Sequence, residues 1–325
     1  SMAIDREAIA ALYYGAVPAT GFVPHAVTYS SRKNTFREEV GEILNVAGDI
    51  DGAKALLKSA GVSSGSFTLT YRDINRNGEI AEAVKAAWEQ LGFKVKLEGL
   101  DYEDYMQRMT LYVEGVSNVF SKEVENEETG LNETKYYMVE KEEGKLIDAD
   151  SASKNGTDIT DQIVGNNSYA LKEKSEEPNS YYDFDVIGLD YQSLNADPFY
   201  TLAPFAPDYS GNAVMTQYND YESRTHMTGY NNSKFNELID QAYAAATREE
   251  AAPILAEAEK QLLQDMPVCP VIFNTDSYVI GSGLSKCKFT TAYGNRDFSK
   301  AKLKNYMNYY PASELELLNN ENDEK

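Results

Sequence analysis

Two segments of the chain alternate apolar and polar residues with the period of a half-buried strand. They are residues 66–73 (SFTLTYRD) and residues 93–102 (FKVKLEGLDY). Between them, residues 80–92 repeat apolar positions at helical spacing, and a glycine ends the repeat. The apolar face of this helix consists of Ile80, Val84, Trp88 and Leu91. The order strand, helix, strand predicts a βαβ unit whose two strands lie parallel in one sheet.

Four other segments carry the apolar stripe and the end signals of amphipathic helices. They are residues 5–15, 50–61, 233–246 and 247–266. Asp5 is expected to cap the first of these helices, and Thr247 and Glu250 have the spacing of a capping box at the start of the last one. Together with the strands, these helices predict a protein of the α/β class.

Two further apolar runs predict strands. Residues 181–192 (YYDFDVIGLDYQ) form one, with Asp190 and Tyr191 at its carboxyl end, and residues 267–281 (PVCPVIFNTDSYVIG) form the last one. In open α/β sheets, ligands gather beyond the carboxyl ends of strands. Asp190 and Tyr191 therefore stand where a ligand-binding residue is expected.

Residues 107–182 change the character of the chain, because they are rich in Glu, Lys, Asn and Ser. Short apolar pieces alternate with Gly and Asn turns, which predicts a polar insertion made of hairpins or of partly disordered chain. The insertion separates a first part, residues 1–106, from a second part, residues 183–283. Residues 284–325 become polar and end in a tail that is expected to be loose.

The acidic balance of the chain restricts its partners. The 325 residues include 52 acidic and 30 basic side chains, which gives a formal net charge of −22. Such a surface repels nucleic-acid phosphates and anionic membranes, so we expect no nucleic-acid partner. No stretch of the sequence approaches the ~20 apolar residues that are needed to cross a bilayer.

Cysteine and histidine are sparse, which argues against a metal centre. The cysteines are Cys269 and Cys287, the histidines are His25 and His226, and no CxxC pair occurs, so a zinc site is not expected. A Cys269–Cys287 disulfide stays open, because nothing in the sequence fixes the distance between the two residues.

The common catalytic and nucleotide-binding motifs are missing from the sequence. It contains no GxSxG, HExxH, GxxxxGK[ST] or GxGxxG pattern, and neither histidine lies near a nucleophile elbow. We therefore expect no catalytic residue and no cofactor. A hydrolase is the weakest of the alternatives.

The stretch DINRNGEI places Asp73, Asn75, Asn77 and Gly78 at positions 1, 3, 5 and 6 of a helix-loop-helix calcium loop. Such a loop needs a carboxylate at position 12, but that position is Val84, on the apolar helical face. The stretch also follows a predicted strand and not a helix. We interpret it as a strand-to-helix turn. A calcium-dependent adhesion or structural module stays as the alternative from another functional class.

Six stretches, taken in order, resemble the extracellular solute-binding proteins of family 5, the oligopeptide- and dipeptide-binding components of ABC importers. They are AIDREAIAALYYGAVPATGFVP, AKALLKSAG, the strand–helix–strand run that ends in DYEDYMQRM, YDFDVIGLDY, GYNNSKFNELIDQA and EAEKQLLQDMPVCPVIF. They cover most of the chain outside residues 107–182. The resemblance implies a periplasmic-binding-protein-like lobe of type II, a mixed sheet flanked by helices, here with a polar insertion.

The resemblance also implies that the chain is the carboxyl-terminal lobe of a receptor whose two lobes close over a peptide. The partners would be that peptide, the missing amino-terminal lobe of the same protein and the permease of an ABC importer. Residues 284–310 would return to the absent lobe. Ser1 and Met2 are interpreted as the remnant of a cleaved tag, so the natural protein is expected to begin upstream. Its place would be extracellular, either on a lipid anchor at the cell surface or in the periplasm.

In peptide-binding members of this family, an Asp that follows the strand matched by VIG accepts the free amino group of the peptide. The matching residue is Asp190; because the chain after it is longer than usual, Asp197 is the alternative. A carboxylate in a closing, poorly hydrated cleft would pair strongly with an ammonium group. Tyr191 and Tyr209 are further candidates for ligand binding. Nickel chelates, haem and sugars are the alternative ligands within the same fold.

Overall fold

A computed structural model gives the fold of most of the chain. It describes residues 1–13, 15–30, 34–109, 112–113, 117–127, 129–140, 145–162, 180–181, 183–191, 193, 195–209, 228–275, 279–281, 283–289 and 296–304. The chain divides into two compact units, Ser1–Phe273 and Asn274–Lys325.

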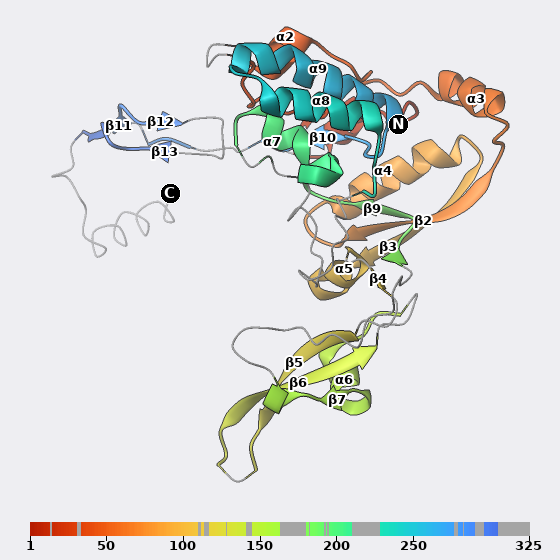
Figure 1. The fold of residues 1–325 in the computed structure, drawn as a ribbon, viewed down its shortest axis with the longest axis vertical. Coiled ribbons are helices and arrows are strands. Elements are labelled where there is room, and N and C mark those ends of the chain that lie inside the picture. The colour runs from red at the N-terminus through yellow and green to blue at the C-terminus, as the bar shows by residue number, and fades with distance from the viewer. Residues whose placement is uncertain are drawn as a thin grey trace, which may run out of the picture. The chain divides into compact units, whose positions relative to one another are not determined.

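The first unit contains a three-stranded sheet in the order β3-β2-β9 (Figure 1). β2 (Gly65–Arg72) and β3 (Phe93–Leu100) are parallel along their full length, and α4 (Asn77–Glu89) connects them. β9 (Val186–Gly188) lies along the other side of β2 and is also parallel to it. The βαβ unit predicted from the hydrophobic pattern is therefore confirmed.

The two faces of this sheet carry different helices, because successive side chains of a strand point to opposite faces. Leu69 of β2 is buried in one apolar cluster with Val84 of α4. On the other face, the neighbouring Thr70 donates a hydrogen bond to Glu98, which is ion-paired with a residue of α5 (Tyr102–Met109). The sheet is thus flanked by α4 on one face and by α5 on the other.

Two short helices complete the cluster over the α4 face. α1 (Arg6–Ala11) begins at the predicted cap, where the Asp5 carboxylate accepts a hydrogen bond from the third residue of the helix. α3 (Ile50–Ser59) contributes Ala53, which is buried in the same cluster as Ile9 of α1. The rest of the apolar stripe predicted for α3 is not buried, since Leu56 is 60% exposed.

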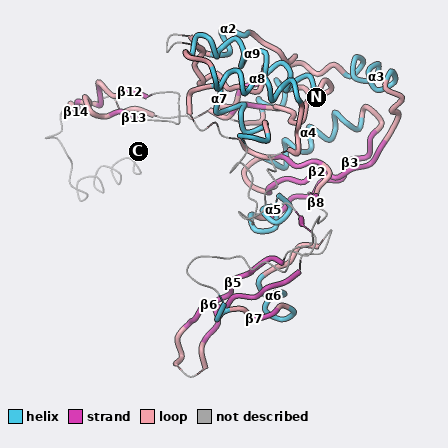
Figure 2. Tube along the Cα trace, viewed as in Figure 1, coloured by secondary structure: helices cyan, strands magenta, loops and turns pink. Residues whose placement is uncertain are grey.

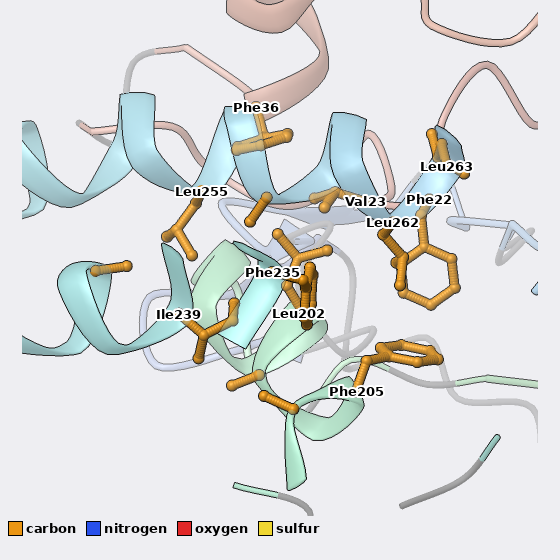
Figure 3. Close-up of a cluster of buried hydrophobic side chains, with 14 of the residues drawn as sticks. Phe22, Val23, Phe36, Leu202, Phe205, Phe235, Ile239, Leu255, Leu262 and Leu263 are labelled. Carbon is orange, nitrogen blue, oxygen red and sulfur yellow. The ribbon is translucent and has the colours of Figure 1, made fainter. Parts of the chain in front are cut away.

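A second core lies among the helices that follow the sheet (Figure 3). α2 (Phe36–Val40), α7 (Pro198–Leu202), α8 (Ser233–Ala244) and α9 (Arg248–Asp265) surround it. The buried side chains labelled in the figure are Phe22, Val23, Phe36, Leu202, Phe205, Phe235, Ile239, Leu255, Leu262 and Leu263. Most of the buried apolar surface of this region thus comes from helices and one loop.

The ends of these helices follow the signals in the sequence. The Thr247 side chain accepts a hydrogen bond from the Glu250 amide, which confirms the predicted cap of α9. After α7, two single 3-10 turns, η2 (Ala203–Phe205) and η3 (Pro207–Tyr209), continue the chain beneath the helical core.

The strand predicted over residues 267–281 is wrong for most of its length. Among the described residues of this run, the structure has a strand only at β10 (Ile272–Phe273), which pairs antiparallel with β1 (Val17–Pro18). Pro270 has no amide hydrogen for a strand ladder, and its carbonyl oxygen accepts a hydrogen bond from the Arg6 side chain. Beyond β10, Val279 is almost fully exposed, which is unlike a residue of an inner strand.

The chain runs from the three-stranded sheet into the polar insertion and back through two short paired strands, which are drawn in magenta in Figure 2. β4 (Tyr112–Val113) and β8 (Ser180–Tyr181) are antiparallel, so the two ends of the insertion lie side by side. The chain can therefore be extended at this point without disturbing the sheet to which it returns.

A hairpin forms the body of the insertion. β5 (Ser117–Glu125) and β6 (Asn132–Glu140) pair over nine residues each, and β7 (Thr157–Asp158) pairs with β6. α6 (Ala149–Asn155) packs on the hairpin, and η1 (Thr160–Gln162) follows β7. This part of the insertion is folded, and its residues 163–179 lie outside the described chain.

The second unit is built from two short antiparallel pairs. β11 (Leu284–Ser285) pairs with β14 (Lys302–Leu303), and β12 (Lys288–Phe289) pairs with β13 (Arg296–Asp297). The expected return of residues 284–310 to another lobe stays a prediction.

The two cysteines are free thiols. The Cys269 sulfur accepts a hydrogen bond from the Arg6 guanidinium at 3.7 Å. The disulfide considered from the sequence is therefore not formed in this structure.

Candidate functional site

The carboxyl ends of three parallel strands meet at one edge of the sheet. Tyr71, one residue before the end of β2, is paired with Gly99 of β3 on one side and Gly188 of β9 on the other. A Cβ atom on Gly99 would lie 2.8 Å from the Tyr71 hydroxyl oxygen, so glycine leaves the space that the tyrosine ring occupies. This edge is where ligands bind in open α/β sheets.

Asp190 lies at this edge, two residues after the last residue of β9, and its side chain is exposed. The sequence therefore placed this carboxylate correctly at the carboxyl end of a parallel strand. Its role in binding stays a prediction.

Helix α5 holds the chain that leads to Asp190. The Tyr105 hydroxyl donates a hydrogen bond of 2.7 Å to the carbonyl oxygen of Gly188. One turn further along α5, the Arg108 guanidinium donates to the Asp183 carboxylate at 2.6 Å. Both side chains of the helix are buried. α5 thus fixes the β9 segment just before the strand and at its last residue.

A further contact ties this segment to β2. The Asp185 carboxylate accepts a hydrogen bond of 2.7 Å from the Thr68 amide. Together with the strand pairing, this bond fixes the register of β9 before the chain reaches its end. The short strand is therefore held by side chains as well as by its ladder.

The pKa of the Tyr105 phenol is shifted by burial and by two nearby charges. Burial raises the pKa of Tyr105 to about 12, and the negative charge of Asp190 adds to the rise, whereas the positive charge of Arg72 opposes it. The charges of Asp190 and Arg72 therefore both act on one phenol. The site carries both signs of charge.

Arg72 is the last residue of β2, and its guanidinium lies over the ring of Tyr102, 4.8 Å from the ring centre. Tyr102 is the first residue of α5 and is largely exposed. Within the part of the chain that the structure describes, no carboxylate forms an ion pair with Arg72. A guanidinium stacked on an aromatic ring and not paired with an acid can accept an anionic group of a ligand.

The other predicted acid, Asp197, has structural partners. Its carboxylate accepts a hydrogen bond from the Phe199 amide at the start of α7 and is 3.2 Å from Nε of Arg248. The structure thus places Asp197 as a helix cap on the helical core, and not at the sheet edge where Asp190 lies.

The two predicted tyrosines also belong to the helical core. The Tyr191 hydroxyl donates to the carbonyl oxygen of Thr201, and its ring packs against Phe22. The Tyr209 hydroxyl donates to Asp240 at 2.8 Å. Burial, followed by this hydrogen bond, raises the pKa of Tyr209 to about 12. The structure thus gives the Tyr191 and Tyr209 side chains partners in the helical core.

Sequence reasoning missed Arg72, Tyr102 and Tyr105. A signal for Arg72 and Tyr102 was present, because Arg72 is the last residue of β2 and Tyr102 follows β3 by two residues, as Asp190 follows β9. Tyr105 lies inside α5, where the rule about strand ends does not select it. The rule about strand ends was applied to one strand and not to its two neighbours.

The stretch that matches a calcium loop forms the turn between β2 and α4. Asn75 adopts a left-handed conformation with φ 54°, and the Asn77 side chain donates to the Arg72 carbonyl oxygen. Val84, at the twelfth loop position, is buried. Across the described residues, no group of three or more His, Cys, Asp or Glu side chains is placed to hold a metal ion. The interpretation as a strand-to-helix turn matches this geometry.

Comparison with known proteins places the first part of the chain. A family model described as bacterial extracellular solute-binding proteins, family 5 middle region, matches residues 1–139. The matched region contains β2, α4, β3 and α5. The description of this model is that of proteins that bind solutes.

Solved structures share the fold of this chain. A clavulanic acid biosynthesis oligopeptide-binding protein is 12% identical with a TM-score of 0.56, over 93% of this chain and 42% of that one. The substrate-binding domain of an oligopeptide ABC transporter from Bacillus anthracis is 15% identical with a TM-score of 0.51, over 94% and 44%. HbpA2 from Haemophilus parasuis is 16% identical with a TM-score of 0.50, over 93% and 43%.

The chain therefore spans less than half of each of these three proteins. A search of curated protein sequences found no match. Among the helices of the described ranges, none has both the length and the apolar character needed to cross a membrane.

Proposed function

We propose that the chain is one lobe of an extracellular peptide receptor that delivers its ligand to an ABC importer. The observation that carries the proposal is the exposed Asp190 carboxylate at the carboxyl end of β9, in a fold shared with oligopeptide-binding proteins. A carboxylate at this edge pairs with the free amino group of a peptide when a second lobe closes over it and excludes water.

The charges at the sheet edge fit a peptide with free ends. Asp190 supplies a negative charge and Arg72 a positive one, and both act on the phenol of Tyr105. A short peptide carries an ammonium group at one end and a carboxylate at the other. Binding of the amino group by Asp190 and of a carboxylate by Arg72 would select such a zwitterion without reading its side chains.

The remaining partners of the proposal are the second lobe and the importer. Coverage of 42–44% of the three relatives supports a chain that is one of two lobes. The permease would receive the peptide from the closed receptor, outside the cell, with the receptor on a lipid anchor or in the periplasm. Lobe closure would be driven by contacts that the ligand makes only when both lobes touch it.

Calorimetry on the full-length receptor that contains this chain tests the proposal. Mixed short peptides with free amino termini are expected to bind, and N-acetylated peptides are expected to bind at least about tenfold more weakly, because a charge-assisted hydrogen bond is lost. Asp190→Asn should remove this difference. Asp161→Asn, an exposed residue of the insertion, serves as the matched control.

Two results contradict the proposal. One is binding of a nickel chelate, haem or a sugar by a receptor that binds no peptide. The other is peptide binding tighter than about 1 μM by this chain alone, because a single lobe lacks the contacts of its partner.

A further inference from the structure

We propose that Tyr105 is a positioning residue that fixes the end of β9 and thereby aims the Asp190 carboxylate at the amino group of the ligand. This inference rests on the proposed function, and it concerns a residue that makes no contact with the ligand itself. It follows from the way in which α5 holds the chain on either side of β9.

The segment before Asp190 is fixed at its start by several contacts. Arg108 donates to Asp183, Asp185 accepts from the Thr68 amide, and three residues of β9 pair with β2. The strand pairing stops at Gly188. Beyond this point the chain leaves the sheet, and Asp190 lies between Gly188 and Tyr191, whose hydroxyl donates to the Thr201 carbonyl oxygen. On the strand side, the position of Asp190 depends on what holds Gly188.

Tyr105 provides that contact at Gly188. Its hydroxyl donates to the Gly188 carbonyl oxygen at 2.7 Å, from a ring that is only 6% exposed. A buried aromatic ring has few rotamers, so the hydroxyl is held at a defined place. The phenol is neutral at physiological pH, because burial and the nearby Asp190 charge raise its pKa, and it therefore remains a hydrogen-bond donor.

The hydrogen bond from Tyr105 to Gly188 contributes more to the position of the end of β9 than to the stability of the fold. Gly188 is exposed, so water can replace the hydroxyl at its carbonyl oxygen when the hydroxyl is removed. Phenylalanine at position 105 would keep the buried ring and its packing. The Tyr105→Phe variant is therefore expected to fold, while the chain from Gly188 to Asp190 loses its anchor on the strand side.

Peptide binding by the full-length receptor is the first test. Tyr105→Phe is expected to lower the affinity for a peptide with a free amino terminus about fivefold, which corresponds to the loss of one neutral hydrogen bond. It should leave an N-acetylated peptide unchanged. In the Asp190→Asn background the same substitution should have no further effect, which is the pattern of a residue that acts through Asp190.

A matched control separates this role from a general loss of stability. Tyr230→Phe also removes a tyrosine hydroxyl hydrogen bond, at 2.6 Å to Asp265, but in the helical core. It should leave both peptides unaffected. Equal weakening of free and acetylated peptides by Tyr105→Phe, or no weakening at all, overturns the inference.

Amide hydrogen exchange on this chain provides a test that needs no ligand. Tyr105→Phe is expected to speed exchange at residues 188–190 by about fivefold, with no such change in Tyr230→Phe. Unchanged exchange at these residues overturns the inference. Absence of peptide binding by the unmodified receptor instead overturns the proposed function, and the exchange result then decides whether Tyr105 anchors β9.

Discussion

The Arg37 guanidinium is ion-paired with the Glu259 carboxylate inside the helical core, where the two side chains are 3% and 0% exposed. The other oxygen of this carboxylate accepts hydrogen bonds of 2.8 Å from the amides of Phe22 and Val23. One acid of α9 thus joins α2 to the loop that enters the core. Its place there was not evident from the sequence, where Glu259 stands among several other acids of an amphipathic helix.

Glu259→Ala is expected to lower the free energy of unfolding by about 3–5 kcal/mol, because it leaves the Arg37 charge buried and unpaired. Two buried amides also lose their acceptor. Urea unfolding followed by circular dichroism measures the change. Glu257→Ala, two residues away and half exposed, is the control and should stay within about 0.5 kcal/mol of the unmodified protein. Equal effects of the two substitutions would show that the buried pair does not stabilise the core.

Asp265 should make stability depend on pH in the acid range. Hydrogen bonds from Tyr230, Gln261 and Asn232 lower the pKa of Asp265 below its ordinary value of 3.8. Because the folded-state pKa is the lower one, the folded protein binds fewer protons. Its contribution is complete above the ordinary pKa and is lost as the pH falls through the folded-state pKa.

Asp265→Asn is therefore expected to destabilise the protein at about pH 7 more than at about pH 3. Free energies of unfolding at the two pH values, for the variant and the unmodified chain, provide the measurement. The hydrogen-bond explanation fails if the difference between the two proteins is the same at both pH values.

The fold was predictable where a local pattern and the tertiary packing agree. The alternation in β2 and β3 and the apolar face of α4 gave a parallel βαβ unit, because these residues are buried on the face that the pattern selects. The run at residues 267–281 is as apolar as a strand, but only Ile272 and Phe273 pair. Prolines and the Arg6 contact decide its conformation, and these depend on residues far away in the sequence.

Of the candidate site, only the residues marked by a local pattern were predictable from the sequence. Asp190 stands at a strand end, which the sequence shows. Tyr105 was not predicted, because its role depends on α5 crossing the sheet to reach Gly188, a residue 83 positions later. The separation of Asp197 from the sheet edge likewise arises from the cap of α7 and the ion pair with Arg248. No spacing rule in the sequence contains these contacts.

Arg72 should select for the carboxylate of a ligand. Arg72→Met in the full-length receptor is expected to lower the affinity for a peptide with a free carboxyl terminus about tenfold. The affinity for an amidated peptide should change little, because only the free carboxylate loses a charged hydrogen bond. Calorimetry with the two peptides gives the ratio. Arg76→Met is the matched control, since its guanidinium is already paired with Glu79. A ratio near one for Arg72→Met would remove the guanidinium from the proposed site.

Gln107 links the insertion to the helix that holds β9. Its side-chain amide donates to the Ile147 carbonyl oxygen at 2.5 Å, and its carbonyl oxygen accepts from the Ile147 amide at 2.9 Å. Gln107→Ala removes both bonds, and we expect faster amide exchange at Ile147 with a change of no more than about 2 kcal/mol in the free energy of unfolding. Glu103→Ala, on the exposed side of the same helix, is the control. Tyr105 and Arg108, which hold the β9 segment, lie on the same helix as Gln107. If contacts with the sheet alone hold α5 in place, Gln107→Ala should leave amide exchange at residues 186–188 unchanged. Faster exchange at these residues would show that the insertion helps to hold the end of β9.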